Sequence, residues 1–200
     1  YGCVPSKALI KTATLARQIR HSSDYGIASA HATIDFAQVM ERVAGVVRAV
    51  EPHDSVARYT ALGVDVVEGH ATLANPWTVD IRKSDGSTQR LTTRSIVIAT
   101  GAAPFVPPLP GLDAVGVLTS DTVWGLTELP ARLVVLGGGP IGCELAQSFA
   151  RLGSQVTQIE MLPRIMIRED EDVSACARQA LESDGVTVLT GHKALRCEKS

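Results

Sequence analysis

The 200-residue sequence predicts an α/β fold, and three observations support this class. Apolar residues recur at helical spacing in the first 60 residues. Short β-rich runs between residues 64 and 92 are broken by turn signals. From Leu133 onward, strand patterns alternate with helix patterns, which indicates parallel strands joined by crossover helices.

The N-terminal part is predicted to be helical. Pro5 suits a first helical turn, where its missing N–H costs nothing. Asp35 followed three residues later by Gln38 resembles a capping box, and Gly63 suits the end of a helix. The expected helices span residues 5–19, 35–50 and 54–62.

The middle of the chain is predicted to be a small antiparallel β meander. The turn signals Asn75-Pro76 and Asp85-Gly86 divide residues 64–92 into short strands. Ser95–Ala99 is a continuous apolar run, which predicts a strand buried on both faces. The proline-rich stretch at 104–110 is stiff and extended, and it is a candidate domain boundary.

The C-terminal part is predicted to be a βαβαβ unit. Its expected strands span 133–136, 155–159 and 186–189, and its expected helices span 140–152 and 170–183.

A glycine-rich motif lies where the first of these strands meets its helix. Gly137, Gly138, Gly139, Pro140, Ile141 and Gly142 match G-x-G-x-x-G, and Glu160 ends the next strand, which is the context of a dinucleotide-binding turn. Gly137 would permit the tight turn, Gly139 the approach of a pyrophosphate, and Gly142 close helix–strand packing. The helix N-terminus would donate to the phosphates, and Glu160 would accept from a ribose 2′-OH. The alternative is a glycine-rich turn that binds nothing.

Composition and cysteine spacing narrow the class of protein. The formal net charge is −2, with no basic stripe, so neither nucleic acid nor an anionic membrane is an expected partner. No apolar run is long enough for a bilayer span. The four cysteines lie far apart without a C-x-x-C pair, so we expect neither a metal site nor a disulfide framework, and we expect a reducing, cytoplasmic location.

Cys3 lies just before a predicted helix and close to Lys7. A helix N-terminus and a nearby cation both stabilise a thiolate, which is the reactive form. A lone cysteine can equally be a small buried hydrophobe, and the residues alone leave both interpretations open.

The segment from Gly2 to Leu9 resembles the end of the redox motif C-x-x-x-x-C-[VI]-P-[SK]-K of the class I pyridine nucleotide-disulfide oxidoreductases. That family includes dihydrolipoyl dehydrogenase, glutathione reductase and mercuric reductase. Cys3 matches the second cysteine, and the first would precede Tyr1, as would the family's FAD-binding glycine motif. We therefore expect the chain to be an internal fragment that is inactive alone.

Further segments carry the same resemblance in the same order. Gly69-His70-Ala71 is similar to a segment that meets the FAD adenine, and Ala99–Pro104 resembles the A-T-G-x-x-P segment that approaches FAD, which implies roles for Ala71, Thr100 and Gly101. Thr119-Ser120-Asp121 looks like the link into the NAD domain, and Gly137–Glu144 matches G-x-G-x-x-G-x-E.

The resemblance implies two Rossmann-like dinucleotide-binding domains, both incomplete: a partial FAD-binding domain at 1–117 and an NAD(P)-binding domain at 118–200. Electrons would pass from NAD(P)H through FAD to a redox-active cysteine pair, or in reverse. Lys7 would lie near the flavin, and Glu144 would pair with it from the nicotinamide side. NAD(H) is expected over NADP(H), because Glu160 would repel a 2′-phosphate.

The implied substrate is a small-molecule disulfide or dithiol, or a metal ion, and the parent protein would be a homodimer. An alternative is a flavoprotein binding or electron-transfer module without disulfide chemistry. The residue five before Cys3 would decide between them. A bare NAD-binding domain is disfavoured by Cys3, Lys7 and the Ala99–Pro104 segment.

Overall fold

The computed structural model describes residues 2–199. The helices are α1 (Cys3–Arg20), α2 (Phe36–Val50), α3 (Val56–Ala61), α4 (Leu112–Val115), α5 (Pro140–Leu152) and α6 (Glu171–Ser183). The strands are β1 (His70–Asn75), β2 (Thr78–Arg82), β3 (Thr88–Thr92), β4 (Arg132–Leu136), β5 (Gln155–Glu160) and β6 (Thr187–Thr190). Short 3-10 helices span Ser22–Tyr25, Glu51–Asp54 and Val123–Gly125.

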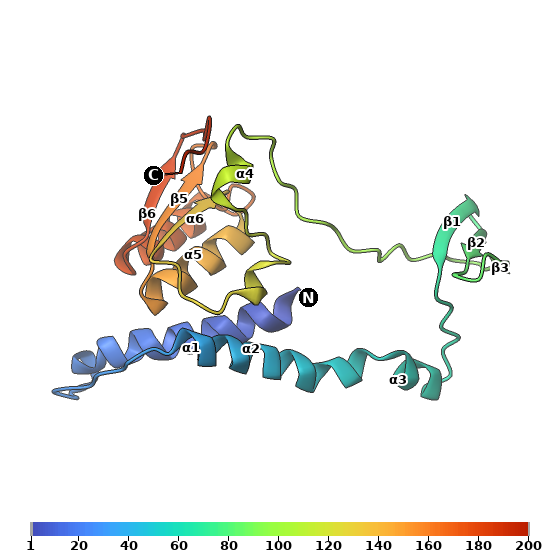
Figure 1. Cartoon of the computed structure of the whole chain (residues 1–200), viewed down its shortest axis with the longest axis horizontal. Helices are drawn as coiled ribbons and strands as arrows, with labels where there is room; N and C mark the ends of the chain where they lie inside the picture. Colours follow the sequence, from blue (N-terminus) through green and yellow to red (C-terminus); the bar gives the residue numbers. More distant parts are fainter. Residues whose placement is uncertain (1, 200) are drawn as a thin grey trace. The chain divides into compact units, whose positions relative to one another are not determined.

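These elements form two compact units (Figure 1). One contains the chain up to Ala49 together with the chain from Pro104 onward, and the other is Val50–Ala103. The break at Pro104 falls where the proline-rich stretch begins. The expected division at 117/118 does not coincide with these units, and it stays a prediction about the two dinucleotide-binding domains.

The C-terminal βαβαβ prediction is confirmed. β4, β5 and β6 form a parallel sheet in that order, with Leu133 opposite Val156 and Ile159 opposite Leu189. The intervening helices are α5 and α6, and each predicted boundary lies within one residue of the observed one. The carboxyl ends of β4 and β5 therefore lie at one edge of the sheet, where the glycine-rich turn and Glu160 are found.

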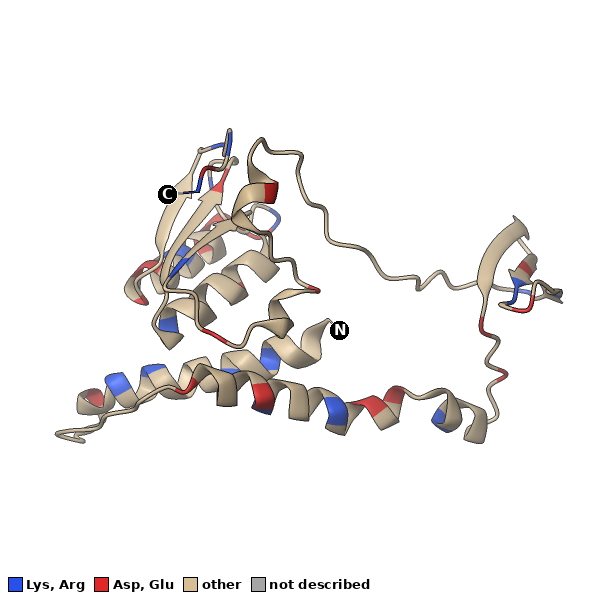
Figure 2. Ribbon diagram, viewed as in Figure 1, with Lys and Arg blue, Asp and Glu red and all other residues tan. Residues whose placement is uncertain are grey.

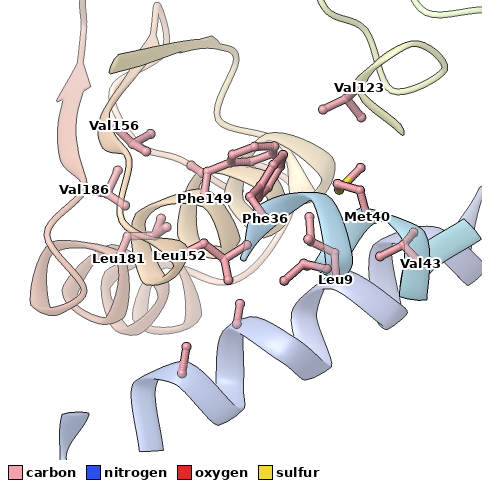
Figure 3. Packing of buried hydrophobic residues seen from close by; sticks show 14 of the residues in the cluster. Leu9, Phe36, Met40, Val43, Val123, Phe149, Leu152, Val156, Leu181 and Val186 are labelled. Atoms are coloured by element: carbon pink, nitrogen blue, oxygen red, sulfur yellow. The ribbon is translucent and has the colours of Figure 1, made fainter. Parts of the chain in front are cut away.

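Helices α1 and α2 pack with α5 and this sheet around one apolar core (Figure 3). The rings of Phe36 on α2 and Phe149 on α5 lie 5.9 Å apart between centroids and are tilted by 44°. Leu9 on α1 is almost completely buried beside them. The N-terminal helices are thus joined by their apolar faces to the unit that carries the glycine-rich turn.

Helices α1 and α5 run in the same direction. Lys7 contacts Glu144, and seven residues further along each helix Arg151 contacts Thr14, so both contacts join residues 137 positions apart. A constant offset requires parallel helices in register. The parallel arrangement places the N-terminus of α1 and the N-terminus of α5 at the same end of the helix pair.

The start of α2 has the expected cap by Asp35, but the Gln38 side chain bonds the Asp35 carboxylate and not its backbone N–H as in a capping box. Asp35 precedes the helix, and its carboxylate accepts from the backbone N–H of Gln38 at 3.1 Å and from the Gln38 side-chain amide at 2.9 Å. These bonds satisfy a donor that a helix N-terminus would otherwise leave free.

The Val50–Ala103 unit contains the predicted antiparallel meander, with strand order β1-β2-β3. The turn between β1 and β2 is closed by a bond from Trp77 N–H to the Asn75 side chain at 2.9 Å. The next turn is closed by Ser87 N–H donating to the Asp85 carboxylate at 2.9 Å. Both turns fall at the signals that the sequence gives.

The strand expected at Ser95–Ala99 is absent from the described residues, and this prediction is wrong. The segment is irregular, and the side chains of Val97 and Ile98 are 87% and 68% exposed. A strand buried on both faces requires neighbouring strands to accept its hydrogen bonds. The described part of the chain supplies no such neighbour to this segment.

Acidic and basic residues are interspersed from α2 to α3 (Figure 2). Among the described residues, no helix is both long enough and apolar enough to cross a membrane.

Candidate functional site

The glycine-rich turn connects β4 to α5, and three glycines have distinct geometries. Gly137 has φ +114°, a conformation that side-chain-bearing residues rarely adopt. A Cβ on Gly142 would overlap the Gly137 carbonyl oxygen, so only glycine lets α5 approach the turn this closely. Gly139 is the N-cap of α5 with φ −75°, and a Cβ there would have no neighbour within 4 Å. The space beside Gly139 is open, as a pyrophosphate-binding turn requires.

Pro140 and Ile141 open helix α5. Pro140 is the first residue of the helix, where its missing N–H removes no helical bond. The side chain of Ile141 is 61% exposed. The helix dipole places partial positive charge at this end, which favours a bound phosphate.

Glu160 ends β5 and is anchored to the glycine-rich turn. Its Oε2 accepts a hydrogen bond from Gly138 N–H at 2.6 Å, and its Oε1 accepts one from Leu162 N–H at 2.8 Å. A carboxylate oxygen can accept more than one bond, so these contacts leave capacity for a ribose hydroxyl. They also fix the negative charge beside the turn.

Gly138 is more constrained than its variable place in the motif suggests. A Cβ on Gly138 would lie 2.9 Å from Ile165 Cγ2 and 3.0 Å from Glu160 Cγ. Its carbonyl accepts from Met166 N–H at 2.7 Å. The segment after Glu160 therefore folds back over the turn, and a side chain at Gly138 would require Ile165 or Glu160 to shift.

Lys7 on α1 and Glu144 on α5 form an ion pair, with Lys7 Nζ 2.6 Å from Glu144 Oε1. The structure thus brings together two residues for which the resemblance implies a pairing. Their side chains are 57% and 36% exposed, and solvated pairs of this kind contribute little to stability. Their role in a reaction stays a prediction.

Cys3 is the first residue of α1 and is exposed to solvent. Gly2, with φ +55°, is the N-cap, and the Ser6 hydroxyl donates to the Cys3 carbonyl at 3.1 Å. Because α1 and α5 are parallel, Cys3 lies at the same end of the helix pair as the glycine-rich turn. Exposure argues against the alternative of a buried, inert thiol.

The residues with an implied FAD role lie in both compact units. Ala71 is on β1, and Thr100 and Gly101 are in the irregular segment after β3. All three residues are exposed. Gly101 has φ +70°, which favours glycine at that position. Lys7 belongs to the other unit, so the contribution of these residues to one FAD site stays a prediction.

Beneath the glycine-rich turn lie two residues that sequence reasoning missed. Gln158 on β5 is completely buried and donates to the Gly137 carbonyl at 2.9 Å. The Cys143 thiol donates to the Gly138 carbonyl at 3.5 Å. Burial raises the pKa of the Cys143 thiol, and the carboxylates of Glu160 and Glu144 add to this effect, which the Gln158 hydrogen bond opposes. The sequence gives little signal for this burial, because Gln158 lies between Thr157 and Ile159 in β5 and only Val156 on its own face is apolar.

Residues 2–199 contain no cluster of three or more His, Cys, Asp or Glu side chains that could hold a metal ion.

The chain resembles known flavoprotein oxidoreductases over nearly its whole length. It is 38% identical over 193 residues to a mercuric reductase from Streptomyces lividans, covering 94% of this chain and 40% of that protein. It is 34% identical over 196 residues to a dihydrolipoyl dehydrogenase from Chlorobaculum tepidum, covering 96% and 41%. The chain thus spans about two fifths of the length of these relatives.

Solved structures give the same result. The HOCl-induced flavoprotein disulfide reductase RclA from Escherichia coli matches with a TM-score of 0.72 and 30% identity, over 98% of this chain and 40% of that one. LpdA from Mycobacterium tuberculosis matches with a TM-score of 0.77 and 26% identity, over 98% and 43%. The family model described as pyridine nucleotide-disulphide oxidoreductase matches residues 1–200, and the chain belongs to this family of oxidoreductases.

Proposed function

We propose that the full-length protein is an FAD-dependent oxidoreductase that passes electrons from NAD(P)H through FAD to a redox-active cysteine pair that includes Cys3, or in reverse. The observation that carries this proposal is the Lys7–Glu144 contact at 2.6 Å. It joins the helix that begins with Cys3 to the helix that begins at the glycine-rich turn. A nicotinamide site and a redox thiol would thus lie at one end of a rigid helix pair.

The chain's own residues have separate tasks in this proposal. The open N-terminus of α5 beside Gly139 would bind the pyrophosphate of the nicotinamide cofactor, and Glu160 would accept from its adenosine ribose. Lys7, held by Glu144, would orient the reacting end of the site. FAD, when bound, supplies two-electron transfer between a nicotinamide and a disulfide.

Residues Lys7, Ala71, Thr100 and Gly101 would hold FAD, in line with the segments that resemble the family's FAD contacts. The described chain would then comprise parts of two Rossmann-like domains that divide near residue 118. The first redox cysteine, which precedes Cys3 in the family motif, would complete the pair.

We propose NAD(H) rather than NADP(H) as the cofactor, and a small disulfide, a dithiol or a metal ion as the substrate. The substrate classes follow from relatives named dihydrolipoyl dehydrogenase and mercuric reductase. We further propose that the parent is a cytoplasmic homodimer without a nucleic-acid or membrane partner.

Replacing Cys3 by serine in the full-length flavoprotein tests the cysteine chemistry. Cys3→Ser should retain reduction of the flavin by NADH, because the nicotinamide site is intact, and should lose reduction of lipoamide and other disulfides. Stopped-flow absorbance and steady-state disulfide turnover measure the two steps. Disulfide turnover that survives in Cys3→Ser would show that Cys3 is not part of the redox pair. A wild type that reduces its flavin with NADH but turns over no disulfide would favour the flavoprotein module without disulfide chemistry.

Replacing Gly139 by alanine tests the nicotinamide site separately. The new methyl group would meet no protein atom and no backbone strain, so the thermal unfolding temperature should change little. The methyl would occupy the space assigned to the pyrophosphate, so binding of NAD⁺ in calorimetry should be lost. Undiminished binding in Gly139→Ala would show that the turn is not the dinucleotide site.

A further inference from the structure

Gln158 is a completely buried polar residue at the centre of the parallel sheet. It lies on β5 two residues before Glu160 and two residues after Val156, so the three side chains share one face of the strand. Val156 is also completely buried. Packing alone would favour an apolar side chain at this position, but the sequence has a glutamine.

The burial of Gln158 carries an uncompensated cost. Its side-chain oxygen Oε1 has no hydrogen-bond partner among the described residues. A buried acceptor without a partner loses its bonds to water and gains nothing in exchange. Such an atom requires an explanation, and the other end of the same amide supplies one.

The Gln158 amide nitrogen is directed at the glycine-rich turn. Nε2 donates to the Gly137 carbonyl at 2.9 Å and lies 3.5 Å from Cys143 Sγ. It also lies 3.2 Å from the position of a Cβ on Gly142, so the turn and α5 close directly over the amide. Gln158 thus contacts the turn from within the sheet, whereas the space beside Gly139 is open.

The Gly137–Gly138 peptide is held at both ends by residues of one strand. Gln158 binds its carbonyl oxygen, and Glu160 binds its N–H at 2.6 Å. Gly137, at φ +114°, has a wider range of backbone conformations than any other residue would have. Without the Gln158 bond, this peptide could rotate, and rotation would withdraw the N–H that anchors Glu160.

We propose that Gln158 is a positioning residue for the nicotinamide cofactor: it fixes the Gly137–Gly138 peptide and, through that peptide, the Glu160 carboxylate. This inference rests on the proposed function, in which the turn binds the pyrophosphate and Glu160 the ribose. A turn that is already ordered before binding loses less conformational entropy when the ligand arrives, so the amide increases affinity without contacting the cofactor.

Replacing Gln158 by methionine in the full-length flavoprotein tests the proposal. Methionine matches the length of glutamine, and it removes both the unpaired oxygen and the bond to Gly137. These two changes oppose each other in the free energy of unfolding, so the thermal unfolding temperature should shift little. The Kd for NAD⁺, measured by calorimetry, should rise roughly three- to tenfold, as expected for the loss of one orienting hydrogen bond. Gln158→Asn keeps the amide but cannot reach Gly137, so it should weaken binding in the same way.

Val156→Ala is the matched control on the same face of β5. It opens a cavity in the core, so it should lower the unfolding temperature and leave the Kd for NAD⁺ unchanged. Unchanged affinity in Gln158→Met and Gln158→Asn would overturn the proposal. An equal loss of affinity in Val156→Ala would also overturn it, because the loss of NAD⁺ binding would then result from the lower stability and not from the missing hydrogen bond. A wild-type protein that binds neither NAD⁺ nor NADP⁺ would overturn the proposed function as well.

Discussion

Glu160 should make the full-length protein prefer NADH over NADPH. Both oxygens of its carboxylate are fixed, one by Gly138 N–H and the other by Leu162 N–H, so the charge cannot swing away from the ribose position. A 2′-phosphate carries about two negative charges, as phosphate monoesters do near neutral pH. At a separation of about 6 Å and an effective dielectric constant of about 40 to 80, the repulsion is about 1.4 to 2.8 kcal/mol.

That repulsion corresponds to a preference of roughly ten- to hundredfold. The measurement is kcat/KM for NADH and NADPH in the wild type, in Glu160→Gln, which keeps the size but removes the charge, and in Glu160→Ala. The ratio should favour NADH and should fall in both variants. Equal or better use of NADPH by the wild type would refute the reasoning.

Arg164 is the first cation after Glu160 in the sequence, and it could reverse this preference by binding a 2′-phosphate. Its Nη1 donates to the backbone carbonyls of Met166 at 3.3 Å and Glu169 at 2.8 Å, which holds the side chain against its own loop. Arg164→Met is therefore the matched control, and it should leave the NADH-to-NADPH ratio almost unchanged.

Four further predictions concern stability and reactivity. Burial raises the pKa of the Cys143 thiol above its ordinary value of 9.0, which leaves less of the reactive thiolate. Near neutral pH, iodoacetamide should therefore label the exposed Cys176 before it labels Cys143, as measured by mass spectrometry. Because the Cys143 thiol has a higher pKa in the folded state than in the unfolded state, the free energy of unfolding should fall as the pH rises above the ordinary thiol pKa of 9.0. An equal fall in Cys143→Ala would contradict this. The Asp184 carboxylate is 3% exposed and pairs with Arg17 and Arg151, so Asp184→Ala should cost about 3 kcal/mol in urea unfolding, whereas a cost below about 1 kcal/mol would contradict a stabilising role for this network. Gly142→Ala should lower the unfolding temperature markedly, since its Cβ would overlap a backbone carbonyl, and calorimetry showing a native transition would refute this.

Local patterns were sufficient to predict most of the fold. Strand and helix periodicity placed β4 to β6 within one residue, and turn chemistry placed both turns of the meander. Gly137 has the positive φ of the expected tight turn and Gly142 allows the expected close helix approach, whereas the pyrophosphate role of Gly139 stays a prediction. These features depend on neighbours in the sequence, so the sequence alone could indicate them.

Features that depend on distant residues were not predictable in the same way. Ser95–Ala99 has the composition of a buried strand, but strand formation depends on partners elsewhere, and the described residues supply none. The support that Gln158 gives to the turn depends on a contact 21 residues away. The Lys7–Glu144 contact spans 137 residues, and only the family resemblance pointed to it.

The two ends of the parallel α1–α5 pair differ in burial: the ionic contacts at the C-terminal end centre on a buried carboxylate, and those at the N-terminal end are solvated. At the C-terminal end, the Asp184 carboxylate is 3% exposed and accepts from Arg17 at 2.9 Å and from Arg151 at 2.8 Å. Buried bonds of this kind fix geometry, because breaking any one of them leaves a charge without a partner. At the N-terminal end, Lys7 and Glu144 are solvated and contribute little to stability. The alignment of that end is therefore set by the buried network and the apolar core, so the solvated Lys7–Glu144 pair is not needed for stability and is available for the role proposed for it.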